Sequence, residues 1–143
     1  MATGQYRRQD MLSSDLDVTT VRANLIPTTS YVASTAVDCR GYREVDFFVD
    51  VHDAGSIAKI TILPESGQAL STSTVEYARY LAETVKDGVA ETHDYEVELN
   101  DPAPVDGMVY KVTVPVQGRY VRVSVKVDDA TASEIGIYAY RRV

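Results

Sequence analysis

Few residues in this chain combine the type and the spacing that a chemical reaction requires. Each of the two histidines precedes an aspartate, in His52-Asp53 and His93-Asp94. Neighbouring side chains on a strand point to opposite faces, so neither pair can bind one metal ion jointly unless the strand breaks there. The sequence therefore predicts no metal site and no cofactor.

Two glutamates form the other arrangement with a chemical meaning. Glu96 and Glu98 share a strand face, about 7 Å apart at ~3.4 Å per residue, and paired carboxylates at such a spacing can cleave glycosides. A solvated acidic face is the simpler interpretation. The chain also has no Gly-x-Ser-x-Gly element and no glycine-rich phosphate loop. We therefore expect no catalytic residue and no enzymatic activity.

The composition is typical of one soluble globular domain. The chain has 143 residues, of which 45% are hydrophobic, and no apolar run approaches the roughly 18 residues of a membrane span. Residues 1–10 lack the apolar core of a signal peptide, which predicts a protein that stays in the cytoplasm where it is synthesised. The net charge of -7 argues against nucleic acid as a partner, and no membrane partner is indicated. The single cysteine, Cys39, is expected to be a buried thiol.

Period-two alternation of apolar residues is the clearest pattern in the sequence. From Val121 to Val127 every second residue is valine, and Phe47 lies in a similar row, so both rows are expected to face a core. Because proline donates no hydrogen bond to a neighbour, Pro115 predicts either an edge strand or a position where its missing N–H faces away from a neighbour. The pattern predicts an all-β, antiparallel, jelly-roll-like sandwich, with strands near 29–37, 45–52, 57–63, 74–85, 93–99, 110–116, 121–127 and 135–140.

Two details of this strand assignment rest on turns and on local composition. The turn at 53–56 predicts a hairpin between strands 45–52 and 57–63, with Pro64 ending the second strand. Residues 74–85 fit either a helix or a strand, and their threonine, valine and tyrosine content favours the strand.

Residues 1–20 read as an extended arm, and 21–143 as the sandwich domain. The arm is polar and has no sustained period, so it cannot bury enough surface to order alone. It is either a frayed end or a segment that folds against a partner. Ten tyrosines without a tryptophan suggest protein interfaces or sugar platforms. The candidate protein-interface residues are Tyr6, Arg7, Arg8, Met11, Leu12, Tyr138, Tyr140, Arg141 and Arg142.

Three stretches together resemble small β-sandwich structural proteins of tailed bacteriophage virions. They are residues 36–43 (AVDCRGYR), 45–51 (VDFFVDV) and 118–123 (GRYVRV), and the likeness spans roughly residues 30–143. The resemblance implies a non-enzymatic capsid decoration (cement) protein on the virion. It also implies contacts with the major capsid protein or other virion subunits, and a homo-oligomer, with a trimer favoured.

Other functions remain open at this point. A neck or tail-adaptor subunit of the virion would have the same kind of fold. A carbohydrate- or cell-surface-binding sandwich module is the main rival, and a small enzyme on this scaffold is a more distant alternative.

The arm hypothesis gives a direct test. Deleting residues 1–17 should leave the melting temperature nearly unchanged but abolish incorporation into purified particles, because an arm that orders on binding contributes to the contact and not to the fold. Normal occupancy of the truncated chain would instead move the interface to Tyr138, Tyr140, Arg141 and Arg142.

Overall fold

The chain is all-β in a computed structural model that describes residues 18–69, 74–129 and 133–143. This described part contains no helix, and hence none that could cross a membrane. The strands are β1 (Val18–Leu25), β2 (Val32–Ala33), β3 (Val37–Asp38), β4 (Glu44–Asp53), β5 (Ile60–Ala69), β6 (Val75–Arg79), β7 (Leu81–Lys86), β8 (Val89–Asp94), β9 (Val97–Leu99), β10 (Val109–Pro115), β11 (Tyr120–Val127) and β12 (Glu134–Arg142).

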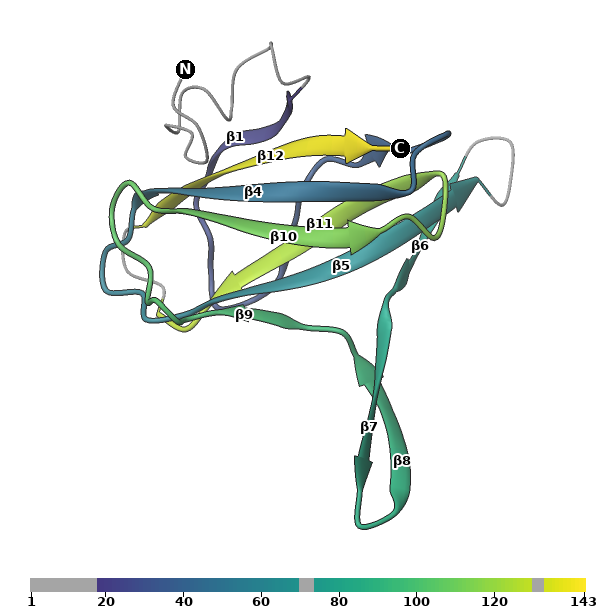
Figure 1. The fold of residues 1–143 in the computed structure, drawn as a ribbon. Helices are drawn as coiled ribbons and strands as arrows, with labels where there is room; N and C mark the ends of the chain where they lie inside the picture. The colour runs from purple at the N-terminus through teal and green to yellow at the C-terminus, as the bar shows by residue number, and fades with distance from the viewer. Residues whose placement is uncertain (1–17, 70–73, 130–132) are drawn as a thin grey trace, which may run out of the picture.

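Two antiparallel sheets face each other and form the body of the molecule (Figure 1). Sheet A has the order β1-β12-β4-β10, and sheet B has the order β2-β11-β5-β6. Two short strands add to sheet B, because β3 also pairs with β11 and β9 also pairs with β5. Strands β7 and β8 pair only with each other and form a hairpin that projects from the body.

The connectivity of the two sheets is that of a jelly roll. Strands β2 and β3 lie on the same side of β11, and β6 and β9 lie on the same side of β5. With each pair counted as one interrupted strand and the hairpin set aside, the spatial orders are 1-8-3-6 and 2-7-4-5. Such a double Greek key is the jelly-roll arrangement. The predicted fold class is therefore confirmed.

Rows of alternating side chains fill the space between the sheets. Phe47 and Val123 are fully buried, so the prediction that both face the core is confirmed. Strand β12 adds a third row, with Ile135, Ile137 and Ala139 inward as its alternation predicts. The other fully buried members of the β4 and β11 rows are Val45, Val49, Val51, Val121 and Val125.

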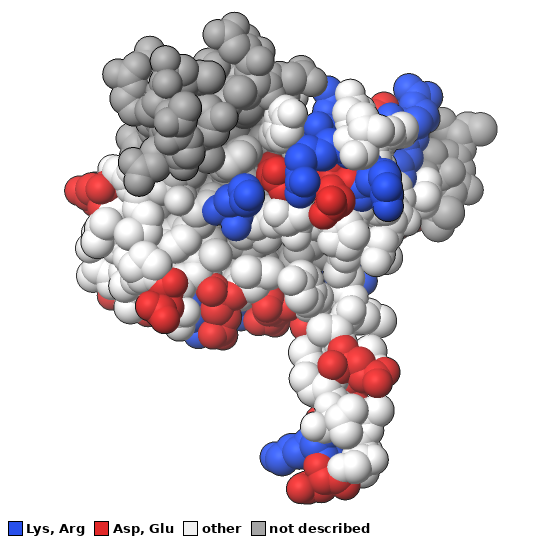
Figure 2. All heavy atoms as spheres, in the orientation of Figure 1, with Lys and Arg blue, Asp and Glu red and all other residues white. Residues whose placement is uncertain are grey.

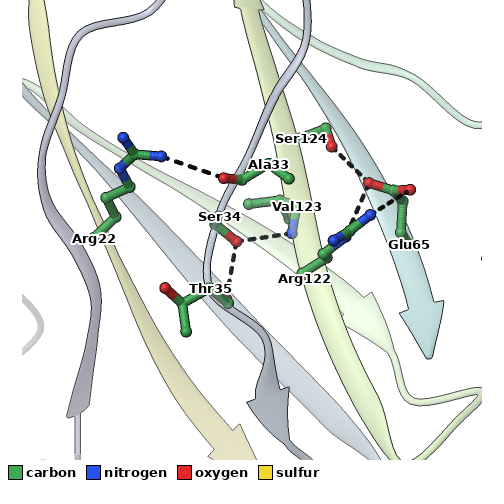
Figure 3. Close-up of polar contacts among 8 residues, drawn as sticks. All are labelled: Arg22, Ala33, Ser34, Thr35, Glu65, Arg122, Val123 and Ser124. Atoms are coloured by element: carbon green, nitrogen blue, oxygen red, sulfur yellow. Dashed lines mark hydrogen bonds and ion pairs between the residues drawn. The ribbon is translucent and has the colours of Figure 1, made fainter. Parts of the chain in front are cut away.

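A serine fills the break between β2 and β3 (Figure 3). The main-chain amide of Ser34 donates to the Val123 carbonyl at 2.8 Å, and the Val123 amide donates to Ser34 Oγ at 3.1 Å. The hydroxyl thus replaces the missing main-chain acceptor of the interrupted strand. On the open side, Arg22 of β1 reaches the Ala33 carbonyl at 3.4 Å. The strand expected over 29–37 is therefore two short strands, and the Ser34 side chain continues the hydrogen bonding to β11 in the break between them.

The predicted hairpin between 45–52 and 57–63 is wrong, because its two strands belong to different sheets. Strand β4 pairs with β12 and β10, whereas β5 pairs with β11, β6 and β9. The turn around Gly55, where φ is 53°, leads the chain from one layer to the other. Alternation identifies a strand but does not specify its partner.

Two prolines behave differently from each other. Strand β5 runs through Pro64 instead of ending there, because the ring nitrogen faces the gap between the β9 pairing at 60–62 and the β6 pairing at 65–69. Pro115 ends β10, and β10 is an edge strand of sheet A, as its proline predicts. Residues 74–85 are extended, so the strand interpretation is correct, but Tyr80 separates β6 from β7.

Cys39 is buried beside the core, as expected of a lone structural thiol. Burial raises the pKa of this thiol to about 11, so it remains protonated near neutral pH. The side chain therefore contributes to packing and has little nucleophilic character.

The central position of Phe47 gives a quantitative prediction. Phe47→Ala should lower the free energy of unfolding by about 3–5 kcal/mol, because a fully buried aromatic ring leaves a cavity between the sheets. Val105→Ala, at an exposed position, is the control and should change it by less than about 0.5 kcal/mol. Denaturant titration measures both values. Equal stability of the two variants would contradict the assigned face of β4.

Candidate interaction surfaces

The interface residues expected from the sequence separate into two groups. Tyr6, Arg7, Arg8, Met11 and Leu12 lie outside the described residues. The other four follow one another along β12: Tyr138, Tyr140, Arg141 and Arg142.

The four β12 residues do not share one face. Tyr138, Tyr140 and Arg142 pair in register with Phe48, Asp46 and Glu44, on the outer face of sheet A. Arg141 has the opposite orientation, and its Nη1 donates to the Asp38 carbonyl at 2.9 Å. The four residues therefore lie on one strand, but its two arginines belong to different clusters, and their role in an interface stays a prediction.

A group of arginines from three segments gathers at this end of the sandwich. We call this group the arginine edge. It comes from the turn before β4, from the start of β11 and from the end of β12, and consists of Arg40, Arg43, Arg119, Arg141 and Arg142. Figure 2 shows basic side chains gathered on this part of the body, away from the hairpin.

A buried carboxylate anchors the end of β12. Asp46 lies on β4, and its side chain is only 7% exposed. Arg142 approaches both of its oxygens, with Nε at 2.9 Å from Oδ2 and Nη2 at 3.1 Å from Oδ1. Thr113 of β10 donates to the same carboxylate at 2.7 Å. The hydrogen bond to Asp46 and the charge of this carboxylate raise the pKa of Arg142. The contacts of Arg142 and Thr113 with Asp46 tie together three strands of sheet A.

A second carboxylate organises the exposed part of the arginine edge. Arg119 Nη2 lies 3.3 Å from Asp38 Oδ2, and Arg40 Nη2 lies 3.6 Å from the same oxygen. The Arg40 amide, followed by the Arg119 side chain, holds the pKa of Asp38 below its usual value. Arg141 lies over the ring of Tyr42, 4.8 Å from its centroid. Among the described residues, Arg43 forms no ion pair, although it is exposed.

The hairpin of β7 and β8 is the second candidate surface, and we call it the projecting hairpin. Its turn is Asp87-Gly88, with φ of 53° and 77°. Two successive positive φ values form the type I′ turn whose twist suits a two-residue hairpin, and Asp-Gly favours this turn. The register runs from Lys86 opposite Val89 down to Leu81 opposite Asp94 without a shift. Local sequence therefore specifies the hairpin.

Tyr80 fixes the base of the projecting hairpin to the sandwich. Its ring is buried, and its hydroxyl donates to the Pro115 carbonyl at the end of β10. Its amide donates to the Pro64 carbonyl at 3.3 Å, and its own carbonyl accepts from the Tyr95 amide at 2.8 Å. Arg79 and Asp94 close the base with an ion pair of 2.7 Å. The base is thus held to both sheets.

Beyond this base, the hairpin has no core. Its largest apolar side chains are exposed: Leu81 by 65%, Val85 by 69% and Val89 by 60%. Leu81 and Val85 lie on one face with Glu83, and Val89 lies on the other face with Glu91. A free two-stranded hairpin is only marginally stable in water, and unpaired strand edges are templates for further pairing. The exposed hairpin therefore has the character of a contact element.

The outer face of sheet B contains the two glutamates that could have served in catalysis. Glu96 and Glu98 line a groove of about 310 Å³ together with Lys59 and Lys126. Lys59 Nζ lies 3.3 Å from Glu98 Oε1, which engages this carboxylate in an ion pair. Burial, followed by the charge of Glu96, raises the pKa of Tyr31 to about 12.

Two tyrosine rings on this sheet, Tyr31 beside the groove and Tyr77 on β6, are each covered on one face by a cation of the same sheet. Lys126 Nζ lies 4.7 Å from the centroid of the Tyr31 ring, and the Arg122 guanidinium lies 3.7 Å from that of Tyr77. Arg122 also pairs with Glu65 at 3.3 Å (Figure 3). One face of each ring is therefore occupied.

Among the described residues, neither histidine pairs with the side-chain carboxylate of the aspartate that follows it. His52 Nδ1 lies 3.0 Å from Glu134 of β12, and Nε2 lies 3.3 Å from Asp50. Asp50 and His52 are two residues apart on one strand, so their side chains share a face. This spacing, and not the neighbouring Asp53, is the feature of the sequence that indicates the pair. His93 Nδ1 lies 2.9 Å from the carbonyl oxygen of Asp94. In residues 18–69, 74–129 and 133–143, no group of three or more His, Cys, Asp or Glu side chains could hold a metal ion.

The sequence matches no protein-family model and no curated protein. The geometry of the arginine edge and of the projecting hairpin is therefore the basis for a functional hypothesis.

The two acid–arginine clusters should differ in stability. Arg142→Met is expected to lower the free energy of unfolding clearly more than Arg40→Met does, because the buried Asp46 loses its charged partner. Arg40→Met should change it by less than about 0.5 kcal/mol, because the Arg40 side chain is 70% exposed. Chemical denaturation distinguishes the two values. If Arg142→Met were as mild as Arg40→Met, Asp46 would not depend on its arginine.

Proposed function

We propose that this chain is a non-enzymatic structural subunit of a virion, a capsid decoration (cement) protein that binds its neighbours through the projecting hairpin and the arginine edge. The observation that carries the proposal is the hairpin. It has a defined register and a rigid base, but both of its faces and both of its edges are open to solvent. Such an element has no use within its own fold and fits a contact with another subunit.

Two further features support this function. Jelly rolls occur in capsid proteins and in lectins, so the fold is compatible with the proposal by analogy alone. The arginine edge adds a surface whose side chains are already ordered by Asp38 and Asp46. Preordered arginines suit protein contacts, because little side-chain entropy is lost when a partner binds.

Two alternatives use the same fold. A neck or tail-adaptor subunit would use the same surfaces on another part of the virion. A carbohydrate-binding module would use the groove beside Glu96 and Glu98, where acids, lysines and Tyr31 come together. The covered ring faces of Tyr31 and Tyr77 favour the virion role, because a sugar platform needs an open aromatic face.

A hairpin replacement tests the proposal. Ala82 and His93 are partners in register and occupy the same kind of hydrogen-bonded position as Lys86 and Val89 beside the present turn, so an Asn-Gly turn in place of residues 83–92 closes the strands without strain. The melting temperature should change little, because the removed residues bury almost nothing. Binding to particles assembled without this chain should be lost, as measured by co-sedimentation of labelled protein with separated heads and tails.

The outcomes separate the alternatives. Loss of binding to heads supports a decoration protein, and loss of binding to tails supports the adaptor. Val105→Ala is the control and should bind normally. Full occupancy by the hairpin-less chain would contradict the proposal. Glycan binding that survives hairpin removal and is lost in Glu98→Gln would instead favour the carbohydrate module.

A further inference from the structure

We infer that the occupant of the projecting hairpin is a second copy of this chain, and that the hairpin of one copy docks on the arginine edge of the next. This inference deepens the proposed function, on which it rests only in using the hairpin as a contact element. It is carried by the charges of the two surfaces, their placement on the molecule and the apolar residues beside them.

The charges of the two surfaces are complementary. The outer part of the hairpin contains Glu83, Asp87 and Glu91 against one base, Lys86, and none of the four forms an ion pair among the described residues. Among the described residues, the five arginines of the arginine edge pair with three acids: Asp38, Glu44 and Asp46. An acidic excess on one surface thus meets a basic excess on the other.

The two surfaces lie on different sides of the molecule. The hairpin leaves the edge of sheet B formed by β6 and β9 and points away from the body (Figure 1). Basic side chains gather on the opposite side of the body, over the end of β12 (Figure 2). The hairpin therefore cannot reach the arginine edge of its own chain. Contact between copies is head-to-tail, and repetition of such a contact gives a closed ring or a filament.

Apolar side chains accompany the charges on both surfaces. On the hairpin, Leu81, Val85 and Val89 are exposed. At the arginine edge, Val143 is 90% exposed beside Arg142, and Tyr42 lies under Arg141. Burial of these side chains would supply affinity, and the charges would set the orientation.

The size of the hairpin limits the strength of the contact. Each strand has six residues, or about 20 Å at ~3.4 Å per residue. Residues 81–94 are fewer than the roughly 20–30 residues that each side of a standard interface provides. The contact is therefore weak between two free copies and becomes cooperative when each copy both gives and receives a hairpin.

A charge-swap experiment tests the inference in solution, without particles. The hairpin variant contains Glu83→Lys and Glu91→Lys, and the edge variant contains Arg40→Glu and Arg43→Glu. All four side chains are exposed, so both variants should fold normally, which their melting temperatures check. Glu76→Lys, at an exposed position outside both surfaces, is the matched control.

Analytical ultracentrifugation at low salt and rising protein concentration gives the readout. The parent chain and Glu76→Lys should self-associate, and each swap variant alone should remain monomeric, because like charges then face each other. An equimolar mixture of the two swap variants should associate again, since each hairpin meets an edge of opposite charge. Added salt should weaken association in the parent and in the mixture.

Three results would overturn the inference: a monomeric parent at all concentrations, normal association of either swap variant alone, or a mixture that stays monomeric. A chain that stays monomeric but loses particle binding with its hairpin would sink this inference and leave the proposed function standing. Self-association through the hairpin without particle binding would support this inference and contradict the proposed function.

Discussion

The two sheets of this protein are connected by side chains and not by a shared hydrogen-bond ladder. Every strand of sheet A pairs within sheet A, and every strand of sheet B within sheet B. The rows led by Phe47 and Val123 are therefore what holds the layers together, through burial of apolar area. Because each strand can direct only alternate residues inward, this requirement fixes the period-two pattern of the sequence and leaves the remaining residues for surfaces.

The sequence predicts this core better than it predicts the pairing of strands. The rows around Phe47 and Val123, the edge position of Pro115 and the burial of Cys39 all follow from local pattern. The partners of β4 and of β5 do not follow from local pattern. A row of valines fits any neighbouring strand, and a short turn can connect either two strands of a hairpin or two strands of different sheets. The prediction that Pro64 ends its strand is wrong for a related reason. A proline ends a strand only where its nitrogen faces a partner, and sequence does not show which side is vacant.

The candidate surfaces were predicted in part. Arg141 and Arg142 were identified by type, but their separate partners, Asp38 and Asp46, are distant in sequence and were found only in the structure. The sequence predicts strands near 74–85 and 93–99 but does not show that residues 81–94 leave the sandwich as a hairpin. A pattern of exposed valines on both faces resembles a weak core strand, and the buried anchor of the hairpin, Tyr80, is not distinguished by its sequence context. Whether an alternating segment faces a core depends on tertiary packing.

The base of the hairpin has a consequence for how this fold could be altered. Tyr80 and Tyr95 are joined by one hydrogen bond, and the strands on either side, β6 and β9, lie along the same edge of β5. The segment between them therefore starts and finishes at nearly the same point of the scaffold. A sequence of another length or character could be inserted there without lengthening any closure within the jelly roll. This position behaves as a cassette, where new binding specificity could be grafted while the folding information stays in the sheets.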